Sequence, residues 1–177
     1  MLKTIFALFI SLAFAISGTA QKLETFSVTL QPKAGANSYL SVSQKKSFSA
    51  SEATANKSSI DVGLVVTPNG NRDILEWYNL SGKDDKIPAD VAGTTTGIAG
   101  LGFDKDLFQK CNTSQDLQRM TTHITNNSFV HFGSVTDEVA AGVKYHCFLL
   151  QLQNGKRALL WVESTDAGTY KVTVKTQ

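Results

Sequence analysis

The sequence lacks the short motifs that identify common enzyme chemistries. It contains no Gly-x-Ser-x-Gly nucleophile elbow, no His-Glu-x-x-His zinc motif and no P-loop. The glycine-rich residues 94–102 come nearest to a phosphate-binding loop, but they have no lysine and no clear following helix. No CxxC pair occurs, and no histidine–cysteine spacing is of the zinc type. The sequence therefore predicts no bound metal and no cofactor.

An excess of charge is also missing. The 177 residues include 17 lysines and arginines against 15 aspartates and glutamates. The densest basic pairs, Lys45-Lys46 and Lys156-Arg157, are typical of solvated turns. Because binding to a nucleic acid or to an anionic membrane needs a clustered basic face, the composition favours neither partner.

The N-terminus has the three parts of a cleavable secretory signal peptide. Lys3 supplies the positive charge, and residues 5–16 form a nearly unbroken apolar run. Gly18 and Ala20 are small residues placed before a cut that would precede Gln21. A helix that spans a bilayer needs about 20 apolar residues, so this shorter run favours cleavage over a retained membrane anchor.

Cleavage of residues 1–20 would leave residues 21–177, a length that fits one domain. We expect this β-rich domain to be secreted, periplasmic or extracellular, with no membrane span after cleavage. No cysteine follows the signal directly, so a lipid anchor is not expected. Two thiols in an oxidising compartment commonly pair, and a Cys111–Cys147 disulfide would stabilise the fold by roughly 3–4 kcal/mol. The alternative is two separately buried free thiols.

Alternating apolar residues and β-branched runs predict several strands. These lie at residues 23–30, 39–42, 60–67, 145–152, 158–163 and 170–174. The last three should form an antiparallel meander, because Asn154-Gly155 is a strong hairpin turn and residues 166–168 make another. Residues 72–80 fit neither the strand period nor the helix period. Residues 81–102 are expected to form a long irregular loop, which in a compact domain is usually functional or mobile.

Two short helices are indicated by their N-terminal capping residues. Ser49 and Glu52 have the spacing of a capping box. Thr113 can cap a second helix, in which Asp116 lies near the positive end of the helix dipole. With about seven strands, the chain is predicted to be mainly β, an antiparallel sandwich with one or two short helices. The alternative is an α+β fold.

Several short segments carry a resemblance. A Phe-Ser pair, a Glu-Ala helix and an Ile-Asp strand follow one another at Phe48-Ser49, Glu52-Ala53 and Ile60-Asp61-Val62. A closing strand pair surrounds a Gly-Lys turn at residues 154–162, and valine and lysine alternate in a final strand at residues 170–175. In these features the chain resembles the small exported β-rich domains of unknown function that are common in Bacteroides-like bacteria. The resemblance implies a surface or periplasmic β-rich domain and brings no known activity with it.

Trp77 and Tyr78 are the candidate binding residues. On an exposed sheet face or loop, flat aromatic rings can stack on sugar rings. The competing interpretation is that one or both of them fill the core, as Trp161 is expected to do in its strongly apolar strand.

The histidines and acidic clusters are interpreted as structural or surface residues. The histidines are His123, His131 and His146. Cys147 with His131 or His123 could form a nucleophile and its base, but the apolar run after Cys147 favours a buried thiol. The aspartates within residues 84–90 and 104–106 could bind calcium, although neither cluster has a complete ligand loop.

These features predict an exported, non-enzymatic module that binds a partner, such as a glycan or a protein, at the cell surface or in the periplasm. Two alternatives stay open: a small secreted hydrolase whose site assembles from loops, and a structural component of the envelope or an adhesin. A flat sheet face that exposes Trp77 or Tyr78 would favour binding. A deep cleft with converging Asp, His or Cys side chains would favour the enzyme.

Overall fold

Two antiparallel β-sheets of five strands each make up the architecture in the computed structural model, which confirms the predicted mainly β fold with short helices. The structure describes residues 20–32, 37–69, 72–81, 85, 87, 88, 90–134, 147–166 and 168–177. In chain order the strands are β1 (Glu24–Leu30), β2 (Tyr39–Ser41), β3 (Lys46–Phe48), β4 (Val62–Asn69), β5 (Arg72–Asn79), β6 (Gly97–Leu101), β7 (Phe132–Ser134), β8 (Cys147–Gln151), β9 (Arg157–Asp166) and β10 (Thr169–Thr176). The helices are α1 (Ala50–Ala55), α2 (Lys105–Lys110), α3 (Ser114–Met120) and the 3-10 helix η2 (Asn126–Ser128).

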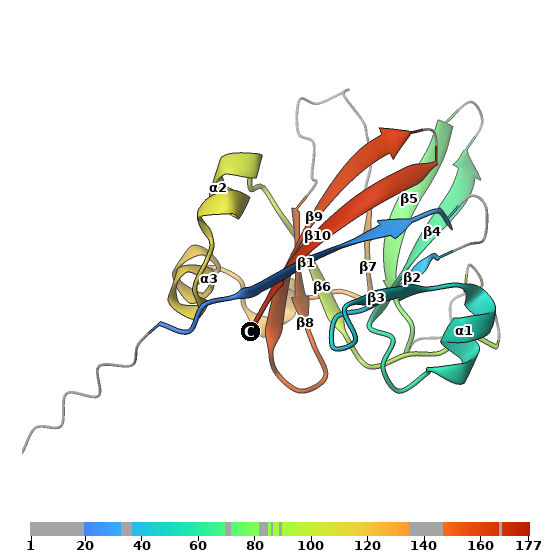
Figure 1. Cartoon of the computed structure of the whole chain (residues 1–177), viewed down its shortest axis with the longest axis horizontal. Helices are drawn as coiled ribbons and strands as arrows, with labels where there is room; N and C mark the ends of the chain where they lie inside the picture. The colour runs from blue at the N-terminus through green and yellow to red at the C-terminus, as the bar shows by residue number, and fades with distance from the viewer. Residues whose placement is uncertain are drawn as a thin grey trace, which may run out of the picture.

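The first sheet has the strand order β1-β10-β9-β8-β6 (Figure 1). It contains the predicted C-terminal meander, in which β8, β9 and β10 are consecutive antiparallel neighbours. Gly155 in the β8–β9 turn has a φ of 79°, a left-handed conformation that favours glycine. At the far edge β1 pairs with β10, so that Phe26 lies opposite Val174 and Val28 opposite Val172.

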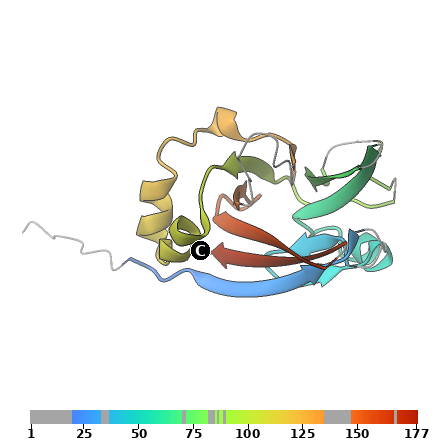
Figure 2. The same ribbon diagram turned by 90° about the horizontal axis from the view of Figure 1, so that it is seen from above.

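The second sheet has the strand order β3-β2-β4-β5-β7. Its central pairing joins β4 to β5, with Leu64 opposite Trp77. Ile98 of β6 exchanges backbone hydrogen bonds of 2.9 Å in both directions with Val130, which lies two residues before β7, so the chain passes from the edge of the first sheet into the second at this point. Both views place α2 and α3 at one end of the molecule and α1 at the other (Figure 2).

Three apolar clusters hold these layers together. The largest, with Trp77 and Phe148, lies between the two sheets. A second lies between the first sheet and the helices α2 and α3, where Phe108 and Leu117 are buried. A third, which includes Tyr78, lies where α1 packs on the other face of the second sheet. Each sheet is therefore covered by apolar side chains on both faces.

Burial on both faces explains why some strands have no clean alternation. In β8, Phe148 and Leu150 belong to the cluster between the sheets, whereas Cys147 and Leu149 belong to the cluster under the helices. Successive residues of β5 likewise enter the first and the third cluster. A strand that is buried on both faces has apolar residues at successive positions and lacks the apolar–polar alternation of a half-buried strand. Residues 72–80 therefore show no clear strand period.

Both predicted helices are present with their caps. At α1, the Ser49 hydroxyl accepts from the Glu52 N–H, and the Glu52 carboxylate accepts from the Ser49 N–H. Thr113 and Asp116 form the same capping box at α3. Helix α2 is an additional element that was not predicted, and it has no capping box. Its N-terminus is capped by the Asp104 carboxylate, which accepts a backbone N–H at 2.8 Å.

The prediction of an irregular loop over residues 81–102 is partly wrong, because β6 lies within it. Gly97 packs so closely that a Cβ placed there would lie 2.8 Å from the Cβ of Phe129. A Cβ on Gly93 would lie 2.6 Å from the carbonyl oxygen of Ile60. These glycines are required by close approach of other segments, and glycine in a sequence does not distinguish that role from a flexible loop.

Some predictions fall on residues outside the described part of the chain. The signal peptide is one, since only Ala20 of residues 1–20 is described. Tyr145 and His146, expected at the start of a strand, are also outside. In the part of the chain that the structure describes, no helix has the length and apolar character needed to cross a membrane.

Candidate functional site

The two aromatic residues predicted to bind a sugar both lie in the interior. Trp77 is fully buried between the sheets, and Tyr78 is 3% exposed within the cluster under α1. The Tyr78 hydroxyl donates a hydrogen bond of 3.0 Å to the buried Glu76 carboxylate. Because neither ring presents a face to solvent, the core interpretation replaces the sugar platform for both residues. Trp161 is buried as well, as its apolar strand predicted.

Cys111 and Cys147 are free thiols, so the predicted disulfide is not formed in the structure. Both side chains are fully buried, and they belong to the same cluster under α2 and α3. Burial raises the pKa of each thiol, and the neighbouring Cys111 raises the pKa of Cys147 further. Since the thiolate is the nucleophilic form of cysteine, this environment disfavours a catalytic role for either residue.

We expect iodoacetamide to label neither cysteine in the folded protein, because both thiols are buried and protonated. Mass spectrometry checks this by counting alkyl groups before and after denaturation.

The disulfide stays a prediction for protein made in an oxidising compartment. In that case the denatured, unreduced chain takes no label, whereas the reduced chain takes a label at Cys111 and at Cys147. Labelling of both residues without a reductant would contradict the bridge.

The histidines and acidic residues that the structure describes do not converge on a site, and His146 and Asp84 lie outside the described part of the chain. His123 and His131 are exposed on separate segments. Asp104 caps α2, and Asp90 accepts a hydrogen bond of 3.4 Å from the Thr54 hydroxyl of α1. Among the described residues, no group of three or more His, Cys, Asp or Glu side chains could hold a metal ion.

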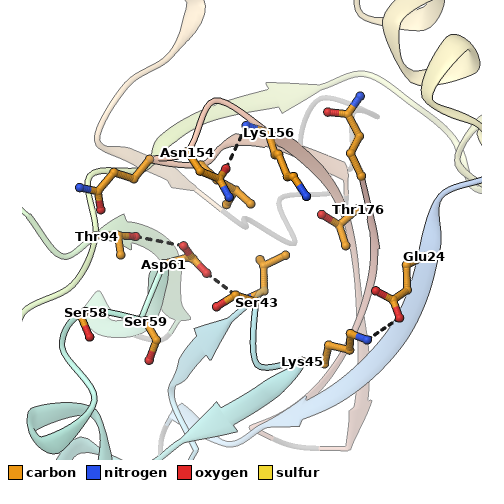
Figure 3. Close-up of a pocket in the computed structure, with 14 residues that line it drawn as sticks. Glu24, Ser43, Lys45, Ser58, Ser59, Asp61, Thr94, Asn154, Lys156 and Thr176 are labelled. Atoms are coloured by element: carbon orange, nitrogen blue, oxygen red, sulfur yellow. Dashed lines mark hydrogen bonds and ion pairs between the residues drawn. The ribbon is translucent and has the colours of Figure 1, made fainter. Parts of the chain in front are cut away.

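A polar pocket of about 460 Å³ opens beside the β8–β9 hairpin (Figure 3). Its walls come from the β2–β3 turn, the segment between α1 and β4, the β8–β9 hairpin and the end of β10. Most of the lining side chains carry a hydroxyl, an amide or a charge, and the apolar ones are Val42 and Leu152. Segments from both sheets therefore build one polar hollow, which we call the Asp61 pocket.

Asp61 supplies a buried carboxylate to this pocket. It is 6% exposed, and its carboxylate accepts hydrogen bonds from the Val42 N–H at 2.8 Å and from the Thr94 hydroxyl at 3.0 Å. Burial raises the pKa of this carboxyl, while these two hydrogen bonds act in the opposite direction. A carboxylate has about four lone-pair positions, so after these two bonds Asp61 can still accept hydrogen bonds from a ligand.

The β8–β9 hairpin and the end of β10 supply hydrogen-bond donors to the pocket (Figure 3). The side-chain oxygen of Asn154 accepts from the Lys156 N–H at 3.0 Å, and the side-chain oxygen of Gln177 accepts from the Arg157 N–H at 3.3 Å. A backbone N–H can only donate, so these bonds fix which end of each amide faces the chain. The amide nitrogens of Asn154 and Gln177, together with the Lys156 ammonium, are left as donors.

The rim of the pocket is close to electrically neutral. Glu24 and Lys45 form an ion pair there, and their side chains are 56% and 45% exposed. The remaining charged side chains of the described lining are Asp61 and Lys156, one of each sign. The pocket can therefore bind a polar, uncharged ligand through hydrogen bonds to acceptors and donors that the fold already holds in place.

One sequence signal pointed to this site. Asp61 begins a strongly apolar, β-branched segment, and a carboxylate is seldom buried in such a place unless it is paired. The other lining residues come from turns far apart in the sequence, and only the packing of the two sheets brings them together.

No protein-family profile matches the chain, and no curated protein matches it in sequence. Among solved structures, the chain is similar to a DUF4466 family protein from Parabacteroides merdae, with a TM-score of 0.58 at 17% sequence identity. The match covers 88% of this chain and 52% of that chain, so this chain spans about half the length of that protein. The likeness shows a shared fold with an uncharacterised protein of a Bacteroides-like bacterium, which agrees with the resemblance seen in the sequence.

Proposed function

We propose that this chain is an exported, non-enzymatic module that binds a glycan in the Asp61 pocket. Export is supported by the signal-peptide pattern of residues 1–20. Glycan binding is supported by the chemistry of the pocket, which replaces the pair Trp77 and Tyr78 as the candidate site.

The observation that carries this proposal is the combination of acceptors and donors in one pocket. Asp61 offers carboxylate lone pairs, while Asn154, Lys156 and Gln177 offer N–H groups. Sugar hydroxyls both donate and accept, so a hydroxyl-rich ligand can satisfy both sets at once. The balanced charge of the lining favours a neutral sugar over an anionic ligand.

The pocket offers groups for binding rather than a catalytic pair. Hydrolysis of a glycoside generally uses two carboxyl groups that flank the bond. The side-chain carboxylates among the described lining residues are those of Asp61, which is held by Val42 and Thr94, and Glu24, which is paired with Lys45. This arrangement favours a binding module over the hydrolase alternative.

A glycan array probed with the purified protein, beside a pull-down of surface proteins, tests the proposal. We expect the protein to be retained on neutral glycans. Retention of proteins alone would support a protein partner and overturn the glycan proposal. No retained ligand in either experiment would overturn the binding function itself.

Asp61→Asn should weaken glycan binding by about tenfold or more, because a hydrogen bond to a charged group is worth roughly 1.5–3 kcal/mol. The variant should still fold, since the amide oxygen can accept from the Val42 N–H while the amide nitrogen donates to the Thr94 hydroxyl. Asp104→Asn is the matched control, because asparagine caps a helix about as well as aspartate. Titration calorimetry with an array-selected glycan measures the affinities, and thermal unfolding verifies the folds.

The same variant tests the titration of Asp61. Its pKa in the folded protein is raised above the unfolded value, so folding takes up a proton in the pH interval between the two. As the pH falls through that interval, the wild type should gain stability relative to Asp61→Asn and lose glycan affinity, because protonation replaces an acceptor with a donor. A wild-type binding profile as flat in pH as that of Asp61→Asn would contradict this role.

A further inference from the structure

Two residues of the Asp61 pocket also line a second hollow. Lys156 and Gln177 belong to both. The second hollow has a volume of about 630 Å³, and because it lies against α3 we call it the α3 hollow. Its lining includes Ala20, which would leave with the signal peptide, and Gln21, with which the exported chain would begin. Because Lys156 and Gln177 form a wall of each, the two hollows adjoin where the β8–β9 hairpin meets the end of β10.

The α3 hollow, like the Asp61 pocket, is lined mainly by polar side chains. Gln115 and Gln118 are exposed and lie three positions apart on α3, which places them on one side of the helix. Gln21 is held beside them, because its carbonyl accepts from the Ser114 N–H at 2.8 Å. Among the described residues of this lining, none is acidic and Lys156 is the only basic one. Side-chain amides both donate and accept, so the hollow suits neutral hydroxyl or acetamido groups.

The junction between the hollows is fixed by side-chain bonds. The Arg157 guanidinium donates to the hydroxyl of Thr121, the C-cap of α3, at 3.2 Å and lies over the Phe129 ring. The Arg157 N–H is bonded to Gln177, which ties the end of β10 to the same hairpin. The spacing between the two hollows is therefore set before a ligand arrives, which lowers the entropic cost of binding a ligand that fills both.

We propose, building on the glycan-binding function above, that the Asp61 pocket and the α3 hollow form one groove that binds an extended, neutral oligosaccharide. One part of the glycan chain lies at Asp61 and another lies against Gln115 and Gln118. Lys156 and Gln177 contact the sugar units at the crossing. A single sugar unit fills only one hollow, so the groove selects for chain length.

Ladders of neutral oligosaccharides of increasing length, both α-linked and β-linked, test the groove when titrated against the purified protein. Affinity should rise along a ladder and then level off once both hollows are filled. In the double variant Gln115→Ala with Gln118→Ala, long oligosaccharides should bind about tenfold more weakly, so that their affinity approaches that of the short ones. Alanine favours helices, so α3 should be retained. Gln109→Ala on α2, an exposed glutamine that lines neither hollow, is the matched control.

The outcomes separate the groove from the binding function on which it rests. If no oligosaccharide of any length binds, the glycan proposal is overturned and the groove with it. Binding that is weakened by Asp61→Asn but does not depend on length would overturn the groove and leave the Asp61 pocket as the site. A length dependence that survives the double glutamine variant would overturn the role of the α3 hollow.

Discussion

Replacing Lys175 with methionine should destabilise the protein by about 3–5 kcal/mol, because the change leaves several buried acceptors without their donor. Lys175 is only 5% exposed. Its ammonium lies within hydrogen-bond distance of the carbonyl oxygens of Phe108 at 2.8 Å, Gln109 at 3.0 Å and Cys111 at 2.9 Å, and of the side-chain oxygen of Asn112 at 3.0 Å. Its three N–H groups are shared among these four acceptors. One cation on β10 thus lies at the carbonyl end of α2, where backbone oxygens lack a full set of helical partners.

Methionine keeps the apolar stem of the lysine and removes only the charge and the donors. Burial lowers the pKa of Lys175, while the nearby Cys111, Asp116 and Cys147 groups act in the opposite direction. Lys171→Met is the matched control, because Lys171 is exposed on the same strand and the same face. Urea unfolding of both variants measures the difference. Equal stabilities would contradict the structural role of Lys175.

Replacing Trp77 with alanine should also destabilise the protein by about 3–5 kcal/mol, the range for truncating a fully buried aromatic side chain. Trp77 lies at 0% exposure in the cluster between the sheets, opposite Leu64 of β4. Phe132→Ala is the control, since that aromatic ring is 41% exposed on β7 and its loss should cost less than about 1 kcal/mol. Chemical unfolding compares the two variants.

Trp77→Phe separates the core role from the sugar-platform hypothesis. It fills much of the same volume, so the chain should fold with a smaller loss of stability. Because Trp77 does not line the Asp61 pocket, glycan affinity should be unchanged in this variant. A folded Trp77→Phe protein that has lost glycan binding would restore Trp77 as a ligand contact and contradict the site described above.

Local patterns in the sequence were enough to predict much of the fold. The Asn154-Gly155 turn identified the C-terminal meander, and the capping boxes at Ser49 and Thr113 identified α1 and α3. These signals depend on residues only a few positions apart. Helix α2 and strand β6 were missed, because a lone Asp cap and glycines required by close packing look like loop residues. Strands β3 and β7 were missed as well, because three residues are too few to show a period.

The site was harder to predict, because its properties depend on contacts between distant segments. The sequence does not show that α2 covers the face of β10 on which Lys175 lies. Trp77 and Tyr78 looked like a binding pair because the sequence does not show that both faces of β5 are covered. Asp61 and Lys156 are far apart in the chain and share a pocket only after the two sheets pack.

Chemical-shift mapping by NMR is the most direct test of glycan binding in the groove. Isotope-labelled protein is titrated with the longest neutral oligosaccharide retained on the array. We predict that backbone amide shifts concentrate at Asp61, Asn154 and Lys156 and extend to Gln118 on α3. Shifts centred instead on Val130 and Phe132, the exposed apolar residues at β7, or no shifts at all, would contradict the assignment of this end of the sandwich as the binding site.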